Sequence, residues 1–238
     1  MYASPGVAGY DRASILFSPQ GYLFQVQYAD EAVKQGSLAI GLTYKDGILF
    51  GAKKQAESRL IVPESLHKIY VVEEHIAIAY SGLVADARRL VQVCRDEAEQ
   101  YRLVYGKEIP VDVLNKRIAE IVQSYTQYGG VRPFGVALLV GGVSDKKIKL
   151  SEIPTSGAML EYLATAIGSG ADKVKAYFES AYKTNMNRDE AISFLISSMK
   201  EAAGKSDKKF SPTQLEIAIL ERKQGFKRLT ESEIKAYL

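Results

Sequence analysis

The sequence predicts an α+β fold in which blocks of strands are separated by pairs of helices. Two short strand pairs precede the first long helices, three strands and a second helix pair follow, and another strand pair lies near the C-terminus. Such blocks favour antiparallel sheets covered by helices, because a parallel sheet needs alternating strands and helices. The 238 residues hold no linker-like stretch rich in Pro, Gly or Ser, which predicts a single domain.

A short amphipathic helix is expected first. Ser18-Pro19 and Gly21 are turn residues, and apolar side chains then recur at nearly helical spacing from Leu23 to Val33.

Two β-hairpins follow this helix in the prediction. Residues 37–44 pair with 48–52 across a turn that ends in Asp-Gly, and residues 68–72 pair with 76–81.

The later elements follow from the same patterns. Cys94 lies on the apolar face of a long helix that ends at Gly106, Asn187 is the expected N-cap of another, and Thr230 with Glu233 predicts a capping box. In chain order we expect helices over 87–105 and 110–128, strands over 134–142, 147–153 and 159–167, helices over 171–182 and 188–203, strands over 215–222 and 226–229, and a helix over 230–238.

Composition argues against several classes of function. A net charge of +3, dispersed along the chain, is too small for a nucleic-acid-binding surface. No apolar run is long enough to cross a bilayer, and the first residues lack the pattern of a signal peptide. His67, His75 and Cys94 form no metal-ligand motif, and no phosphate-binding loop is present. We therefore expect a soluble cytoplasmic protein without metal, cofactor, nucleic acid or membrane partner.

Four stretches of the chain carry a resemblance to a known family. They are 10–36, with YDR at 10–12, FSPQGYLFQVQYA at 17–29 and EAVKQG at 31–36; SGLVADAR at 81–88; YTQYGGVRPFG at 125–135; and AIGSG at 166–170. In this order and at this spacing they resemble the α subunits of the 20S proteasome, archaeal type. The resemblance covers almost the whole chain.

The resemblance implies a four-layer αββα sandwich, the fold of N-terminal-nucleophile hydrolases and proteasome subunits. It divides the chain into a gate segment with an α-type helix, residues 1–36, and the sandwich, residues 37–238. It also implies partners: identical α subunits in a seven-membered ring, proteasome β subunits, and an ATPase activator ring whose C-terminal tails end in a hydrophobic residue, tyrosine and any residue.

Catalysis by this chain alone is not expected. The related β subunits use an N-terminal threonine whose free amine assists its hydroxyl. Here the equivalent first strand starts at Ser37 in mid-chain, and the position of the family's acidic partner carries Lys53. Lys68 matches the family's catalytic lysine, but in α subunits this lysine serves another purpose.

The resemblance assigns three sets of site residues. Gate residues are Tyr10, Asp11, Arg12, Pro19 and Tyr28. Activator-binding residues are Lys68, Gly36, Gly82, Leu83, Leu23 and Gln27, with Lys68 pairing the terminal carboxylate of the tail. The channel annulus is Tyr128, Gly129, Gly130 and Val131. From the residues alone, Lys68 would be a solvated lysine at a strand end, Gly82 a turn glycine, and Tyr28 with Pro19 the packing of a helix end.

Three positions depart from the family pattern. Tyr22 stands where a basic residue is usual, Gln27 where an acidic one is usual, and Asp30 where archaeal members carry a basic one. We expect ring formation to tolerate these changes, and gating and activator affinity to be altered. Two alternatives stay open: a hydrolase that unmasks Ser37 by cleavage after Gly36, and a paralogue that builds α-only rings.

Overall fold

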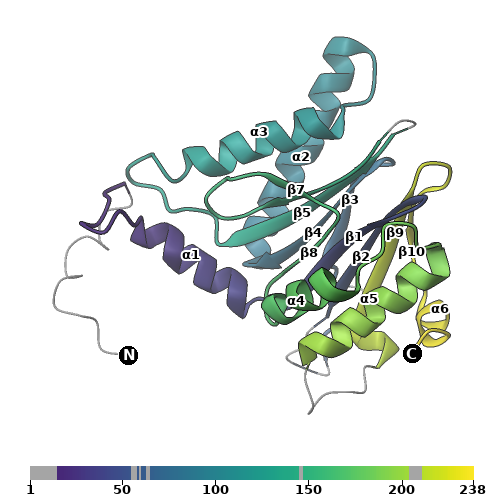
Figure 1. The fold of residues 1–238 in the computed structure, drawn as a ribbon. Coiled ribbons are helices and arrows are strands. Elements are labelled where there is room, and N and C mark those ends of the chain that lie inside the picture. The colour runs from purple at the N-terminus through teal and green to yellow at the C-terminus, as the bar shows by residue number, and fades with distance from the viewer. Residues whose placement is uncertain (1–14, 55–57, 59, 63–64, 145–146, 204–210) are drawn as a thin grey trace.

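Two five-stranded antiparallel sheets lie face to face in the computed structural model (Figure 1). The structure describes residues 15–54, 58, 60–62, 65–144, 147–203 and 211–238. The first sheet has the order β10-β9-β2-β1-β8 and the second the order β3-β4-β5-β6-β7. Every strand pair in the described ranges is antiparallel, as the segregated strand blocks predict.

The first sheet is built on the hairpin of β1 and β2. Its strands are β1 (Ala39–Tyr44), β2 (Gly47–Lys53), β8 (Ala164–Ile167), β9 (Leu215–Glu221) and β10 (Gly225–Arg228). Tyr44 pairs with Gly47, so the hairpin turn is the two residues Lys45 and Asp46. A side chain at Gly47 would approach the carbonyl oxygen of Leu220 to 2.1 Å, and glycine therefore permits this strand pairing.

The second sheet contains β3 (Ile69–Glu73), β4 (Ile76–Gly82), β5 (Val136–Val143), β6 (Ile148–Ile153) and β7 (Leu160–Tyr162). Its inner face packs on the first sheet through fully buried side chains such as Phe50 and Leu150. Gly41 and Gly141 make room for these two. A Cβ on Gly41 would lie 2.8 Å from Leu150 Cδ1, and one on Gly141 would lie 2.5 Å from the Phe50 ring.

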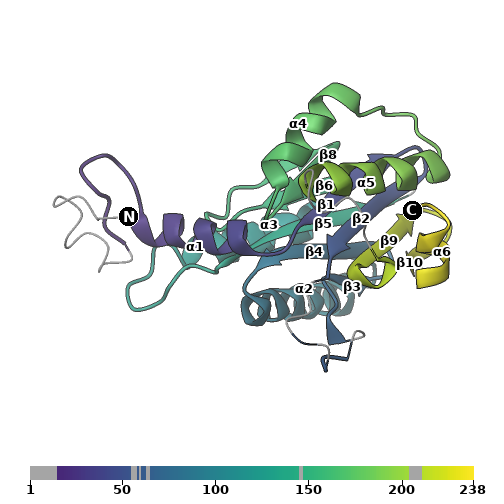
Figure 2. The ribbon, with the colours of Figure 1, turned by 90° about the horizontal axis from the view of Figure 1, so that it is seen from below.

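Helix pairs cover both outer faces. The helices α2 (Val84–Tyr105) and α3 (Val111–Ser124) pack on the second sheet, and α4 (Ala171–Ala181) and α5 (Arg188–Ala203) pack on the first. Figure 2 shows α4 and α5 on one side of the sheets and α2 on the other. The predicted four-layer arrangement is confirmed. A 3-10 turn, η2 (Pro212–Gln214), precedes β9, and a short helix, α6 (Glu231–Lys235), follows β10.

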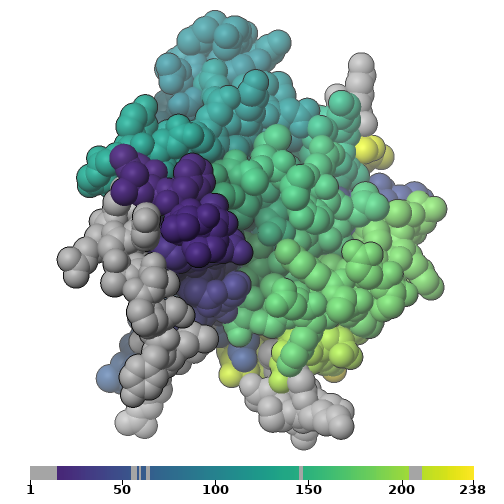
Figure 3. Space-filling model, turned by 60° about the vertical axis from the view of Figure 1, so that its left-hand side comes forward, coloured from purple at the N-terminus to yellow at the C-terminus, as the bar shows by residue number. Residues whose placement is uncertain are grey.

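The helix α1 (Phe24–Gln35) lies outside these layers, against one end of β4 and β5. Figure 3 shows the purple N-terminal segment between the teal surface of the α3–β5 region and the green surface that follows β6. Ala29 and Val33 are its buried residues. Twelve residues make a helix about 18 Å long.

One predicted strand is wrong. The sequence predicts a single strand over 159–167, but these residues form two strands that belong to different sheets. The first, β7, pairs with β6, whereas β8 pairs with β1. Leu163 stands between them, and its carbonyl oxygen accepts hydrogen bonds from the Thr43 amide at 2.7 Å and the Thr43 hydroxyl at 3.0 Å. A crossing between sheets is a long-range event that local alternation cannot show.

Helix ends also differ from prediction. The 87–105 helix begins at Val84, and the 110–128 helix ends at Ser124. The expected caps are confirmed: Gly106 has a φ of 66°, Asn187 Oδ1 accepts from the Glu190 amide at 2.9 Å, and Thr230 forms a capping box with Glu233. The last helix is shorter than expected, because it ends at Lys235.

Candidate functional site

The ends of α1, β1, β4 and β8 meet around Ser37. Gly36 follows α1, and its carbonyl oxygen accepts a hydrogen bond from the Ser169 amide at 2.8 Å. The Ser81 hydroxyl, on β4, donates to the carbonyl oxygens of Val33 and Ser37, both at 3.1 Å. This polar cluster joins the last turn of the N-terminal helix to both sheets.

Lys68 is buried beside Ser37. Its Nζ donates to the Ser37 carbonyl oxygen at 2.8 Å and to Ser37 Oγ at 2.5 Å, and it lies 4.9 Å from the centre of the Tyr80 ring. The residue is 8% exposed. Burial lowers the pKa of Lys68 to about 8, although the nearby Glu216 carboxylate opposes the shift. The interpretation of Lys68 as a solvated strand-end lysine is therefore wrong.

A buried carboxylate lies behind this lysine. Glu216, on β9, accepts from the Lys68 backbone amide at 2.7 Å and from Arg228 Nε at 2.8 Å, and it lies 3.2 Å from His67 Nδ1. Arg228 also donates to the Ile69 carbonyl oxygen at 2.8 Å. The network holds the start of β3, and so Lys68, in place. Sequence reasoning missed Glu216, although an acid between apolar residues of the strand LEIAILE is a visible signal.

Glycines allow these elements to approach closely. A Cβ on Gly36 would lie 2.4 Å from the Gly82 amide nitrogen, and one on Gly82 would lie 2.2 Å from the Gly135 carbonyl oxygen. Gly82 also has a φ of 114°, a region that L side chains rarely adopt. Gly82 is therefore required for close packing as well as for its backbone conformation, unlike an ordinary turn glycine. Leu83, next along the chain, is 45% exposed and packs beside Gly135.

The Ser37 site lacks the groups of an N-terminal nucleophile. The Ser37 nitrogen is part of the peptide bond with Gly36 and has no free amine in the intact chain. Lys53 stands at the end of β2, where its amide bonds to the Leu38 carbonyl oxygen at 3.0 Å. A lysine there cannot act as the carboxylate partner of a neighbouring base.

The predicted activator-binding residues fall into separate groups. Lys68, Gly36 and Gly82 meet at the C-terminal end of α1, and Leu83 lies beside them. By contrast, Leu23 is the N-cap of α1 and Gln27 is exposed in its first half. The length of α1 keeps Leu23 away from Gly36 within one chain.

The gate residues are described only in part. Tyr10, Asp11 and Arg12 lie outside the described residues. Pro19 is exposed in a turn, and the Tyr28 ring, 49% exposed, stacks on Phe24 with centroids 6.4 Å apart. Gly21, with a φ of 83°, closes the turn because its amide donates to the Ser18 carbonyl oxygen at 2.8 Å.

The predicted annulus residues form an exposed loop between α3 and β5. Tyr128 is 65% and Val131 39% exposed. Gly130 has a φ of 85°, and a Cβ built on it would have no atom within 4 Å. The nearest atom to a Cβ on Gly129 would be Ile15 Cδ1 at 4.0 Å. The N-terminal segment and this loop therefore lie side by side.

Two of the residues that depart from the family pattern, Asp30 and Tyr22, differ in their surroundings. The Asp30 carboxylate accepts a hydrogen bond from the hydroxyl of Thr155, which is fully buried in the loop after β6. Tyr22 is 52% exposed. Asp30 therefore ties α1 to the body of its own chain.

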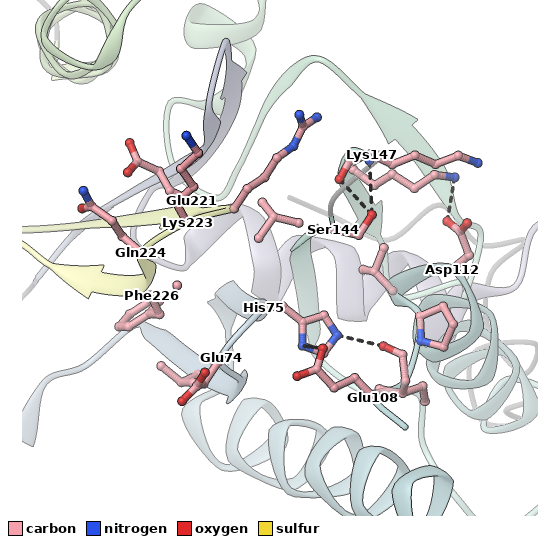
Figure 4. Close-up of a pocket in the computed structure, with 18 residues that line it drawn as sticks. Glu74, His75, Glu108, Asp112, Ser144, Lys147, Glu221, Lys223, Gln224 and Phe226 are labelled. Atoms are coloured by element: carbon pink, nitrogen blue, oxygen red, sulfur yellow. Dashed lines mark hydrogen bonds and ion pairs between the residues drawn. The ribbon is translucent and has the colours of Figure 1, made fainter. Parts of the chain in front are cut away.

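A pocket lies at the opposite end of β4. It has a cavity volume of about 820 Å³ and is lined by residues near the turns that join β3 to β4, β5 to β6 and β9 to β10, and by the connection between α2 and α3. Figure 4 shows His75 at its centre, with Nε2 directed at the Ile109 carbonyl oxygen 2.9 Å away. Its wall carries both acidic and basic side chains, and none of the predicted site residues lines it.

The described ranges carry neither a membrane span nor a metal cluster. Each helix within them is too short or too polar to cross a membrane. The same residues contain no group of three or more His, Cys, Asp or Glu side chains placed to hold a metal ion.

Comparison with known proteins agrees with the fold. The family model described as "Proteasome subunit" matches residues 33–220, and the model of the N-terminal signature of A-type proteasome subunits matches residues 10–32. The proteasome α subunit of Methanopyrus kandleri is 46% identical over 235 residues, which cover 99% of this chain and 94% of the relative. The equivalent protein of Methanosarcina acetivorans is 47% identical over 232 residues, covering 97% and 92%. The chain therefore belongs to the family of proteasome α subunits, the noncatalytic subunits of the 20S core.

Proposed function

We propose that this chain gates the axial opening of the 20S core and docks an activator through Lys68. The observation that carries the proposal is a buried ammonium group at the convergence of Gly36 and Gly82, with the exposed Leu83 beside it. An ammonium group has three N–H donors. Two of those of Lys68 are used by Ser37, so one is left for the terminal carboxylate of an activator tail.

The separation of the predicted residues supports a site shared by two copies. Lys68, Gly36 and Gly82 lie at one end of α1, and Leu23 and Gln27 lie toward the other. Neighbouring copies in a ring would bring the two groups together, with the hydrophobic and tyrosine residues of the tail next to apolar surface. We propose a ring of seven identical α subunits that caps a β ring and receives an ATPase activator.

The N-terminal part would control access. Residues 1–36 form the gate segment in this proposal, with Tyr10, Asp11, Arg12, Pro19 and Tyr28 as its cluster, and residues 37–238 form the scaffold. Tyr128, Gly129, Gly130 and Val131 would line a narrow annulus below the gate, because small residues let seven backbones approach closely. Proteolysis would be performed by threonine residues of the β subunits, in the cytoplasm.

Replacement of Lys68 by alanine tests the docking role. The variant and the wild-type chain would be assembled with a proteasome β subunit, and hydrolysis of a short fluorogenic peptide measured with and without an ATPase activator that has the tail motif. We expect Lys68→Ala to abolish stimulation while native mass spectra still show the ring. Lys147→Ala, exposed just before β6, is the matched control and should be stimulated normally. Normal stimulation of Lys68→Ala would overturn the proposal.

A hydrolase is the second candidate, because Ser37 Oγ and Lys68 Nζ are only 2.5 Å apart. Such an enzyme would have to cleave the bond after Gly36 to free the Ser37 amine. Intact mass separates the candidates: a chain that begins at Ser37 and hydrolyses peptides alone would favour the hydrolase. An intact chain that forms rings but never pairs with a β subunit would instead indicate an α-only ring.

A further inference from the structure

Arg132 and Asp86 form a two-pronged ion pair at one stem of the loop that precedes β5. Arg132 Nη1 lies 2.6 Å from Asp86 Oδ2, and Arg132 Nη2 lies 2.8 Å from Asp86 Oδ1. The Asp86 side chain is 11% exposed, whereas that of Arg132 is 59% exposed. Paired parallel hydrogen bonds of this kind fix direction as well as distance.

The same carboxylate also fixes the start of the strand. Asp86 Oδ2 accepts the Gly135 amide at 2.9 Å, and the Gly135 carbonyl oxygen in turn accepts the Leu83 amide at 2.9 Å. Between Arg132 and Gly135, Pro133 has a fixed φ and holds the preceding Arg132 in an extended conformation. One buried acid in the first turn of α2 thus orients the whole segment 132–135. Arg132 and Gly135 together hold the pKa of Asp86 below its usual value.

The other stem is held by packing. The Tyr125 ring lies 4.4 Å from the Phe134 ring, centre to centre, and the buried Thr126 donates its hydroxyl to the Gln123 carbonyl oxygen at 2.6 Å. Residues 127–132 between these stems are exposed. Two glycines in the exposed part add no side-chain contacts, so the path of the loop depends on its stems.

We propose that the Asp86–Arg132 pair positions the 127–132 loop and thereby limits the size of chain that passes the annulus. Both are positioning residues. The inference rests on the proposed function, in which Tyr128 to Val131 line the channel. It adds that the width of the annulus is set by an ion pair that joins Asp86 on α2 to Arg132 at the stem of the loop.

Hydrogen exchange tests the clamp without reference to the channel. We expect amides of residues 127–135 to exchange faster in Arg132→Ala than in wild type, by on the order of tenfold, because a charge-assisted pair is lost. Arg132→Lys should recover part of the protection. The control is Arg117→Ala, which breaks an ion pair of α2 that lies away from the loop, the one between Arg117 on α3 and Glu97. Unchanged exchange in Arg132→Ala would overturn the inference.

Substrate passage tests the consequence. Cores assembled with a β subunit would be assayed with casein, an unstructured protein, and with a fluorogenic tetrapeptide. We expect Arg132→Ala and Asp86→Asn to raise the casein-to-peptide rate ratio, with Arg117→Ala unchanged. A purely structural defect would lower both rates together. If exchange rises and the ratio stays constant, the pair holds the loop but the loop does not line the path, which would overturn its annulus role in the proposed function.

Discussion

The ammonium nitrogen of Lys68 lies 2.5 Å from Ser37 Oγ and 2.8 Å from the carbonyl oxygen of the same residue. Lys68 immediately precedes β3 of the second sheet, and Ser37 leads into β1 of the first sheet, so these hydrogen bonds connect the two sheets. This contact ties the two sheets together beside α1, and it keeps a cation in a place from which most water is excluded.

The lowered pKa of Lys68 predicts a pH-dependent stability. The folded chain has a pKa of about 8 for this group against 10.5 for the free side chain, so the unfolded state binds more protons between these values. The free energy of unfolding should therefore rise as pH increases from 8 to 10.5, by on the order of 3 kcal/mol, because of the titration of Lys68. Urea unfolding of wild type and Lys68→Met across this range measures it, and a constant difference between the two would contradict it.

The same titration predicts weaker activator docking in alkaline solution. Below pH 8 the amine is charged and can pair a carboxylate, and above that value it becomes neutral, because the pKa of Lys68 is about 8. Binding of a tail peptide to the assembled ring should fall as pH passes through about 8. A tail peptide with an amidated C-terminus is the control, since its binding should be weak and nearly independent of pH.

Gly82 should not tolerate a side chain. Gly82→Ala places a Cβ 2.2 Å from the Gly135 carbonyl oxygen at a φ of 114°, and strain plus overpacking should cost about 2 to 5 kcal/mol. Gly130→Ala is the matched control, because its φ is also positive but its surroundings are open. It should cost only about 1 kcal/mol. Equal losses of stability in denaturant titrations would show that backbone strain alone, and not close packing, decides both positions.

The negative charge of Glu216 should be needed for the stability of the fold. Glu216→Gln leaves the Arg228 guanidinium without its buried counter-ion, and we expect about 3 kcal/mol of destabilisation. The exposed Glu161, which pairs with Lys149, provides the comparison: Glu161→Gln should cost about 1 kcal/mol or less.

A double variant tests whether the loss of stability in Glu216→Gln comes from the unpaired charge of Arg228. Adding Arg228→Met to Glu216→Gln removes the unpaired cation, so part of the lost stability should return. Additive losses in thermal unfolding would contradict an interaction between the two groups.

Thr155 should anchor α1 through Asp30. In Thr155→Val the hydroxyl that bonds the Asp30 carboxylate is lost from a fully buried position, which should cost about 1 to 3 kcal/mol. Amides of α1 should then exchange faster with solvent. Thr43→Val, which removes from the first sheet a hydroxyl that donates to the Leu163 carbonyl oxygen, should leave the α1 amides unaffected.

Most elements could be predicted because their signals are local. The Asp46-Gly47 pair specifies a hairpin, the Thr230 and Glu233 spacing a capping box, and the glycine at 106 a helix end. Each of these depends on a few consecutive residues and on backbone preferences that hold in any context. Periodicity likewise locates the helices, with errors of a few residues at the ends where capping and packing compete.

The resemblance identifies the family, but not the contacts that make its site. It points to Lys68, Gly36 and Gly82, yet it says nothing of their arrangement around Ser37. The roles of Glu216, Asp86 and Arg132 are equally invisible to it, because Asp86 and Arg132 are 46 residues apart and Lys68 and Glu216 are 148 apart. No local pattern reports on pairs so distant.

The sequence by itself determined the helices, most strands, the turns and the family, because these depend on local propensity and on motif order. Only the tertiary structure decided that residues 159–167 divide between two sheets, that Lys68 is buried, and that Asp30 bonds its own chain. The physical reason is that burial and pairing are properties of packed surfaces. They follow from which elements meet, and segments far apart along the chain meet only when the two sheets close on one another.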